Sequence, residues 1–455
     1  MSDEARMLRL SEKEIQDHQF ERLKVTLERA KKAPYFAERL SGASVNSLAD
    51  LAKLPLTTKE DLRAASPFGA VAVPHAELFQ YHESFGTTGA VVSSWLSAND
   101  FQEYAHQINQ CDLDFQPDDM LVNKFPYAIS VPAHIVKLAA QNRGACVVSA
   151  SSLTQVCPYT RTLDLMRKLK ATVLTCLPTE ATLLGAAAVA MGMNPARDFD
   201  IRAIGTAGEL LTDARRRRIE ELWDCKVYNY YGTTETGNLA SESNEGQMHL
   251  AWDHFLVEIL DEETQEVLPP NQPGMPAITT LTREAMPLIR YVLTDRIRLE
   301  AVDSTPSGRR SPVVHHYGRD QSRFPFKDRQ VSLADLEDRL FRLPTEVVGD
   351  IWMVIIAPDQ VVFRVEAAKP DPAKYAKAEK EVGEELNIPL AIEAVGVGEV
   401  FPTQWLLEPA RVGKPAYYCQ VPSLDRAPRN LPELWMGPPP SGPPGEGDEA
   451  PPGLY

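Results

Sequence analysis

The middle of the chain alternates short apolar runs with longer amphipathic segments. The short runs predict buried strands at 120–124, 145–149, 171–177, 201–205 and 226–229. The segments between them carry apolar residues at helical spacing and predict helices at 131–141, 159–170, 179–191 and 212–223. Thr212 and Asp213 supply an N-cap and a first-turn acid for the last helix. This alternation predicts successive strand–helix–strand units around a parallel sheet.

Four consecutive arginines, Arg215 to Arg218, fall within the last of these helices. Because four adjacent positions cover all sides of a helical turn, we expect the run to form a solvated, charged surface.

The pattern of predicted elements changes after Trp252. Short β-rich pieces at 255–260, 277–281 and 296–302, separated by Pro- and Gly-containing turns, predict a small β subdomain. An α+β unit follows, with helices at 333–341 and 373–386 and strands at 351–357 and 361–366. Beyond Ala427 the sequence is rich in Pro, Gly and acidic residues and predicts a disordered tail. The expected domains are therefore 1–317 and 318–426, followed by a tail at 427–455.

Length and charge narrow the function further. A chain of 455 residues favours at least two domains. Its net charge of −16 argues against nucleic acid or an anionic membrane as partner. An apolar run of about 20 residues and the apolar core of a signal peptide are both missing from the sequence, so we expect a cytoplasmic protein. The six cysteines are scattered, without metal-ligand spacing, and are expected to be reduced and structural.

Two segments have the composition of phosphate-binding loops. Residues 83–89 read Glu-Ser-Phe-Gly-Thr-Thr-Gly, where glycines let backbone N–H groups converge on an anion and threonines add donors. Taken alone, such a segment is more often an ordinary solvated turn. Residues 230–237 form a second such segment and add Glu235, a carboxylate of the kind that holds Mg²⁺ beside phosphates. Gly208-Glu209 and Tyr231-Gly232 both follow closely after predicted strands, where ligands bind in open α/β sheets. The two phosphate-type segments and the metal-type acid together indicate nucleotide chemistry.

With these segments, residues 15–420 resemble the adenylate-forming superfamily, and within it the phenylacetate–CoA ligase-like branch. The matching motifs are the phosphate loop at 84–89, the segments at 205–209 and 231–235, and several pieces of 249–295, namely 252–255, 281–287, 289–291 and the acid Asp295. The resemblance implies an α/β fold with a large N-terminal domain of parallel-type sheets with helices plus a small β subdomain, and a small mobile α+β C-terminal domain. It also implies a two-step reaction in which a carboxylate attacks the ATP α-phosphate and a nucleophile then captures the acyl-adenylate. ATP and Mg²⁺ are the implied cofactors, with CoA a candidate acceptor.

The resemblance assigns roles residue by residue. Nucleotide contacts are expected at Ser84, Gly86, Thr87, Thr88 and Gly89 of the phosphate loop, at Gly208 and Glu209 beside the adenine, at Tyr231 stacked on it, at Gly232 and Thr233, at Asp295 on the ribose hydroxyls and at Arg319 near the hinge. Thr234, Glu235 and Lys414 are the expected catalytic residues: Thr234 at the α-phosphate, Glu235 as Mg²⁺ ligand and Lys414 as the cation near the acyl-phosphate. For Lys414, a solvent-facing lysine before Pro415 is the plain alternative.

The acid substrate is expected to lie among Phe125, Tyr127, Ala128, Gly205, Ala207 and Gly237. Aromatic and small residues suit a flat ring acid, although an aromatic beside a strand end also serves as core packing. Benzoate-like, anthranilate-like and arylacetate-like acids all remain open.

Three positions depart from the family pattern. Ala90 stands where the phosphate loop often has Lys or Ser, and the hinge acid is replaced by Gln321, with Asp320 one position earlier. Asp328 stands where CoA ligases have a glycine beside the pantetheine channel, so it adds bulk and charge. An amine, a hydroxyl or a carrier-protein thiol, in some cases on an acceptor enzyme, is therefore an alternative acceptor to CoA. An inactive binding protein of the same fold is a remoter alternative, and the sequence leaves an oligomer open.

Overall fold

The structure is a computed structural model that describes residues 7–84, 91–152, 156–319, 323–407 and 417–436. Within these residues the largest sheet has nine strands, in the spatial order β4–β3–β5–β6–β7–β8–β9–β14–β13. Its strands are β3 (Met120–Asn123), β4 (Cys146–Ser149), β5 (Val173–Cys176), β6 (Ala203–Ala207), β7 (Lys226–Thr233), β8 (Gly237–Glu242), β9 (Met248–Leu250), β13 (Asp295–Glu300) and β14 (Val313–Arg319).

One half of this sheet is the parallel sheet that the sequence predicts. Strands β4, β3, β5, β6 and β7 pair in parallel. The connecting helices are α6 (Pro132–Asn142), α7 (Tyr159–Lys168), α8 (Pro178–Ala190), α9 (Pro195–Asp198) and α10 (Asp213–Trp223). Thr212 caps α10 as expected, because its hydroxyl accepts a hydrogen bond from the Arg215 amide at 3.1 Å. The predicted α/β class is thereby confirmed.

The other half of the sheet is antiparallel. β8, β9, β14 and β13 continue from β7 with alternating direction. The piece at 296–302, expected in the small β subdomain, lies instead in β13 at the edge of the large sheet. The small sheet consists of β10 (Phe255–Leu260), β11 (Met275–Thr280) and β12 (Tyr291–Val292).

The N-terminal segment lies against these two sheets. It forms α2 (Glu12–Ala30), α3 (Pro34–Arg39), η1 (Leu48–Lys53), α4 (Lys59–Ala65) and η2 (His75–Glu77), then the hairpin of β1 (Leu78–Ser84) and β2 (Val92–Ser97), and α5 (Ala98–Ile108). The β1–β2 hairpin flanks residues 85–90, so Gly86, Thr87, Thr88 and Gly89 lie outside the described residues.

The C-terminal region has its own four-stranded sheet, in the order β19–β18–β17–β20. Its elements are the hairpin of β15 (Arg323–Phe326) and β16 (Arg329–Ser332), α11 (Leu333–Leu340), β17 (Trp352–Ile356), β18 (Val361–Glu366), α12 (Pro372–Leu386), β19 (Leu390–Val395), α13 (Thr403–Leu407) and β20 (Tyr418–Gln420). The helices and strands expected here are confirmed. Described structure continues past the expected start of the tail at 427, through η4 (Leu424–Arg426) and α14 (Leu431–Met436).

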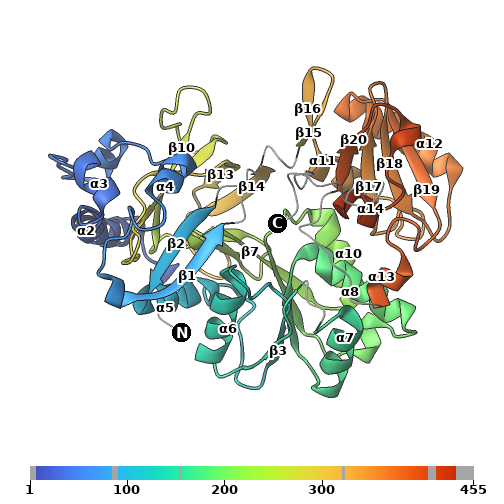
Figure 1. The fold of residues 1–455 in the computed structure, drawn as a ribbon, viewed down its shortest axis with the longest axis horizontal. Helices are drawn as coiled ribbons and strands as arrows, with labels where there is room; N and C mark the ends of the chain where they lie inside the picture. Colours follow the sequence, from blue (N-terminus) through green and yellow to red (C-terminus); the bar gives the residue numbers. More distant parts are fainter. Residues whose placement is uncertain (1–6, 85–90, 153–155, 320–322, 408–416, 437–455) are drawn as a thin grey trace, which may run out of the picture.

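An apolar cluster joins the N-terminal and C-terminal regions. It contains Leu183 and Leu184 of α8 together with Phe401, Leu406 and Leu431 of the C-terminal region. Figure 1 shows α7, α8 and α10 between the nine-stranded sheet and the C-terminal elements. The C-terminal region is therefore packed against the helices that follow β4, β5 and β6.

The expectation of a solvated arginine run is wrong for two of its members. Arg215 and Arg218 are buried, and their guanidinium groups pair with Glu337 and Asp350 of the C-terminal region at 2.5 and 2.9 Å. Arg218 also donates to the Val348 carbonyl at 2.7 Å. The C-terminal region docks directly on α10 and so buries one side of a helix that would otherwise face water.

Among the helices of the described ranges, none is long and apolar enough to cross a membrane. The six cysteines are unpaired thiols, as expected, and Cys146 is exposed.

Candidate active site

The hairpin that flanks the first phosphate-type segment lies against the second segment. Ser84, at the end of β1, is buried, and its hydroxyl accepts a hydrogen bond from the Val92 amide at 3.3 Å. Two residues further along β2, the Ser94 hydroxyl donates to the Thr234 carbonyl at 3.1 Å. The hairpin that flanks the first segment is thus bonded to the second, which lies 140 positions away in sequence.

The second segment is a closed turn between β7 and β8. The backbone amides of Thr233 and Thr236 each donate to the other residue's hydroxyl at 3.2 Å. At Gly232 a Cβ would come within 2.0 Å of the Gly237 carbonyl oxygen, so only glycine fits there. Thr234, at the apex of this turn, remains partly exposed. The turn therefore presents Thr234 on a rigid support.

A buried arginine links β2 to the neighbourhood of the second segment. Arg283 donates to the Ser94 hydroxyl at 2.8 Å and to the Tyr104 hydroxyl at 2.6 Å. Tyr104 in turn donates to the Glu235 carbonyl at 3.1 Å. The motif at 281–287 contributed to the resemblance, but the sequence reasoning gave Arg283 no role. Its structural role is to link β2, through Ser94, and α5, through Tyr104, to the turn that contains Thr234 and Glu235.

Glu235 has a buried carboxylate that lacks a hydrogen-bond donor at one of its oxygens among the described residues. The residue is 3 % exposed, and its Oε1 has no hydrogen-bond partner among the described residues. A buried carboxylate oxygen without a donor is costly unless a cation or a ligand compensates for it. Nowhere in the described ranges do three or more His, Cys, Asp or Glu side chains gather as a metal site. Mg²⁺ is often bound by one or two carboxylates plus substrate phosphates, so the donor set fits that ion in the presence of a nucleotide.

The expected ribose and adenine contacts meet at the junction of β13 and β14. Asp295 is buried and lies opposite Arg319 in the register of the two strands. The His316 ring donates from Nε2 to Asp295 Oδ1 at 3.1 Å, and its centroid lies 4.4 Å from that of Tyr231. His316 was missed by the sequence reasoning, because a lone histidine in a strand carries no local signal. It fixes the Asp295 carboxylate and packs against Tyr231.

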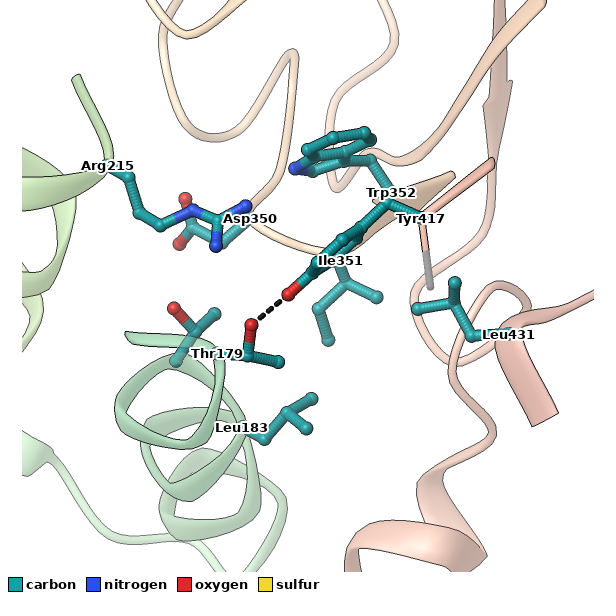
Figure 2. Close-up of a pocket in the computed structure, with 9 residues that line it drawn as sticks. Thr179, Leu183, Arg215, Asp350, Ile351, Trp352, Tyr417 and Leu431 are labelled. Atoms are coloured by element: carbon teal, nitrogen blue, oxygen red, sulfur yellow. Dashed lines mark hydrogen bonds between the residues drawn. The ribbon is translucent and has the colours of Figure 1, made fainter. Parts of the chain in front are cut away.

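Gly208 and Glu209 follow β6 at the carboxyl edge of the sheet. Gly208 adopts a positive φ of 84°, which favours glycine. Glu209 Oε2 accepts hydrogen bonds from the Thr179 amide at 3.1 Å and from the Thr179 hydroxyl at 2.6 Å. The Thr179 hydroxyl is also hydrogen bonded to the hydroxyl of Tyr417, as Figure 2 shows. Lys414 itself lies outside the described residues, but the chain that resumes at Tyr417 contacts the Glu209 side of the site.

The expected substrate residues fall into two groups. Tyr127 and Ala128 lie in the loop after β3; Ala128 is exposed, and the Tyr127 hydroxyl accepts from the Asn123 amide nitrogen at 3.1 Å. Ala207, at the end of β6, is half-buried. These three positions are accessible from the loop edge of the sheet.

The second group is enclosed by protein. Phe125 is buried in the apolar cluster beneath β3. A Cβ on Gly205 would lie 3.0 Å from Leu113 and 3.1 Å from Tyr230, and one on Gly237 would lie 2.7 Å from Tyr104. The Phe125 side chain and the Cα atoms of the two glycines therefore face core residues.

A further buried acid lies next to Thr179. Glu180 is 4 % exposed, and neither of its carboxylate oxygens has a hydrogen-bond partner among the described residues. Burial raises the pKa of Glu180 to about 8, although the Lys124 ammonium opposes the shift, and Glu209 adds to it. The helix α8 therefore begins with a carboxyl that is neutral at pH 7.

Comparisons with known proteins agree with this geometry. The family model of the AMP-binding enzymes matches residues 86–278. The phenylacetate-coenzyme A ligase of Thermus thermophilus is 28 % identical over 383 residues, 80 % of this chain and 82 % of that protein. The phenylacetate-coenzyme A ligase of Aromatoleum evansii is 30 % identical over 303 residues, 64 % of this chain and 67 % of that protein.

Solved structures agree on the fold. The crystal structure of 2-hydroxyisobutyryl-CoA ligase in its postadenylation state, in complex with 2-HIB-AMP, superposes with a TM-score of 0.79 at 20 % identity over 91 % of each chain. The same ligase in its thioesterification state gives 0.65 at 21 % identity, again over 91 % of each chain.

Proposed function

The chain belongs to the AMP-binding enzymes, in the phenylacetate–CoA ligase-like branch of the adenylate-forming superfamily, and we propose that it activates an aromatic carboxylic acid. In the first half-reaction an oxygen of the acid attacks the α-phosphorus of ATP and pyrophosphate leaves, giving an aryl-adenylate. In the second, the thiol sulfur of CoA attacks the acyl carbon, the thiol proton is lost, and AMP leaves with the electron pair of the broken carbon–oxygen bond. The acid–thiol ligase class follows from the family, whereas the aromatic substrate is the proposal.

The observation that carries this proposal is the hydrogen-bonded link between the hairpin that flanks the first phosphate-type segment and the turn of the second segment. Ser94 and Arg283 tie β2 to the turn that contains Thr234 and Glu235. Nucleotidyl transfer depends mainly on positioned donors and on charge compensation at the phosphates. The turn holds Thr234 in place, and the buried Glu235 oxygen without a partner among the described residues offers a place for a charge-compensating cation.

We assign the residues of the site by combining the motifs with this geometry. Thr87, Thr88 and Gly89 would hold the β- and γ-phosphates, Thr234 the α-phosphate and Asp295 the ribose hydroxyls, with Gly208, Glu209 and Tyr231 around the adenine. Glu235 would hold Mg²⁺, which neutralises phosphate charge when bound. Lys414 would stabilise the charge that develops on the α-phosphate during the first half-reaction. Tyr417 supports the last assignment, because it follows Lys414 by three residues and is bonded to Thr179 beside Glu209.

The aromatic substrate rests on the names of the curated relatives and on the composition of the loop after β3. Both relatives reported above are phenylacetate-coenzyme A ligases. Tyr127, Ala128 and Ala207 offer one ring and two small side chains at the accessible edge. A change of one methylene alters selectivity by only about 1–3 kcal/mol, so benzoate, anthranilate and phenylacetate all belong in the test.

Transfer to an acceptor other than CoA is a second candidate, favoured by Asp328. This residue lies in the turn between β15 and β16, and its side chain is 89 % exposed in the present arrangement of the domains. A carboxylate beside the thiol path would repel the phosphates of CoA.

The test is ATP–pyrophosphate exchange with a panel of aromatic acids, followed by product analysis with and without CoA. We expect exchange that depends on one of the acids and a thioester product that depends on CoA. Exchange without a thioester would select the second candidate. A lack of exchange with every aromatic acid, but exchange with an aliphatic acid, would refute the aromatic assignment.

A further inference from the structure

One buried arginine touches both the nucleotide side of the site and the C-terminal region. Arg215, in the first turn of α10, donates from Nε to Glu337 Oε1 at 2.9 Å and from Nη2 to Glu337 Oε2 at 2.5 Å. The Arg215 and Glu337 side chains are 10 % and 4 % exposed. Its third nitrogen, Nη1, lies 3.7 Å from Glu209 Oε2. A single cation is thus shared by two carboxylates from different regions of the chain.

A second path connects the same partners. Glu209 accepts from the Thr179 hydroxyl, which is hydrogen bonded to Tyr417, and the Tyr417 ring lies 5.2 Å from the Arg215 guanidinium. Figure 2 shows Arg215 on one side of this interface with Tyr417 and Trp352 facing it. The cavity between these side chains measures about 20 Å³, room for about one water. The contacts among Arg215, Glu209, Thr179 and Tyr417 form a closed ring, because the Tyr417 aromatic ring also lies against Arg215. Glu337 is joined to this ring through Arg215, and both Glu337 and Tyr417 belong to the C-terminal region.

The balance of charges makes this ring sensitive to separation of the domains. Burial lowers the pKa of Arg215, but Glu337, Tyr417 and Glu209 outweigh it, so the net shift is upward and the guanidinium stays charged. If one partner is removed while the domains stay docked, the remaining buried charge loses its main partner. Among the described residues, Arg215 then keeps only the longer carboxylate contact, to Glu209, and Glu337 keeps only the hydrogen bond from the Thr212 hydroxyl, which is unfavourable. If the domains separate, water hydrates both charges, so the pair can dissociate and re-form.

We propose that Arg215 and Glu337 are positioning residues that hold the C-terminal region in the arrangement for adenylate formation and that separate before acyl transfer. The inference rests on the proposed function, because it assigns the docked arrangement to the first half-reaction. Two observations favour that half-reaction: the chain just after Lys414 takes part in the ring, and Asp328, aligned with the acceptor channel, is turned to solvent. Glu209 makes the ring continuous with the nucleotide site.

The experiment measures the two half-reactions separately in the full chain. Glu337→Gln keeps the side-chain shape and removes one charge. Arg215→Gln removes the other charge and leaves a shorter polar side chain, and Arg215→Lys keeps the charge without the two parallel hydrogen bonds of the guanidinium. Arg217→Gln is the matched control, because Arg217 is exposed on the same helix. Pyrophosphate exchange reports the first half-reaction with phenylacetate, or with whichever acid the panel above selects. Conversion of the supplied acyl-adenylate to its CoA thioester reports the second.

We expect exchange to slow by roughly tenfold or more in Glu337→Gln and Arg215→Gln, and thioester formation from supplied adenylate to change by less than about twofold or to rise. Arg215→Lys should fall between these variants and wild type, and Arg217→Gln should match wild type. The double variant should slow exchange no more than the worse single variant, because both act on one contact. Equal losses in the two half-reactions, or wild-type exchange in Glu337→Gln, would overturn the proposal.

Small-angle X-ray scattering of the substrate-free protein separates this proposal from the proposed function. Glu337→Gln should shift the scattering towards a more extended particle, whether or not any tested acid is a substrate. An unchanged scattering profile for Glu337→Gln and Arg215→Gln would refute the positioning role. An absence of exchange in wild type, with the expected shift in scattering, would instead count against the proposed function alone.

Discussion

Replacing Glu180 with glutamine should stabilise the protein at neutral pH, by an amount that grows as the pH rises. Glu180 lies in the first turn of α8 with both carboxylate oxygens buried and unpartnered among the described residues. Burial raises its pKa from 4.5 to about 8. Glutamine keeps the shape of the protonated acid and cannot ionise. At low pH the two proteins should therefore be nearly equal in stability.

The magnitude follows from proton linkage. Between pH 4.5 and pH 8 the folded protein retains a proton that the unfolded chain has released. The free energy of unfolding of wild type then falls by about 1.4 kcal/mol per pH unit because of this residue. The stabilisation from the raised pKa is complete below pH 4.5, is lost as the pH rises towards 8, and changes no further above it. Between pH 5 and pH 7 the free energy of unfolding of the variant, relative to that of wild type, should rise by roughly 3 kcal/mol.

Urea unfolding followed by circular dichroism at pH 5, 6, 7 and 8 measures this difference. Glu221→Gln serves as control, because Glu221 is exposed on the neighbouring helix α10 and the exchange of charge is the same. The free energy of unfolding of the control should change with pH in parallel with that of wild type. If the free energy of unfolding of Glu180→Gln also changes with pH in parallel with that of wild type, the assignment of a neutral, buried carboxyl is refuted.

Three further predictions concern the reaction. Lys414→Ala should slow pyrophosphate exchange on the order of 10²–10³-fold and spare capture of supplied adenylate; equal effects on both steps would exclude the assigned role. Glu235→Gln should raise the Mg²⁺ concentration needed for half-maximal exchange with little change in the urea midpoint, because a ligand charge is lost and the shape is kept. A Mg²⁺ titration identical to wild type would contradict this. Asp328→Gly should raise thioester formation from supplied adenylate without changing exchange; robust CoA turnover by wild type that the substitution leaves unchanged would remove Asp328 from the acceptor path.

The parallel half of the sheet could be predicted because its signal is local. Strands such as β5 are continuous apolar runs, and Thr212 caps α10 through its own neighbours in sequence. Residue 296 onwards was placed in the wrong sheet, because the partner of β13 is set by pairing with β14 and alternation alone does not specify that partner. Of the site, the motifs mark Gly232 and Asp295, since a required glycine and a required acid leave a fixed pattern, and the ligand roles of these residues stay predictions.

The residues that were missed depend on distant partners. Arg215 looked like a surface charge because Glu337 lies 122 positions later, and nothing in the run of arginines indicates which member will be covered. His316 acquires its role only when β14 lies beside β13 and β7 brings Tyr231 to the same place. Burial of polar groups by tertiary contact overrides the local pattern in both cases.

The apolar cluster that α8 shares with Phe401, Leu406 and Leu431 has a thermal consequence. A rotation of the C-terminal region that uncovers this face transfers apolar surface into water, and such a transfer raises the heat capacity. The equilibrium between the docked and rotated arrangements would then follow a curved van't Hoff plot. Temperature, as well as ligands, would set how the enzyme divides its time between activating the acid and passing it on.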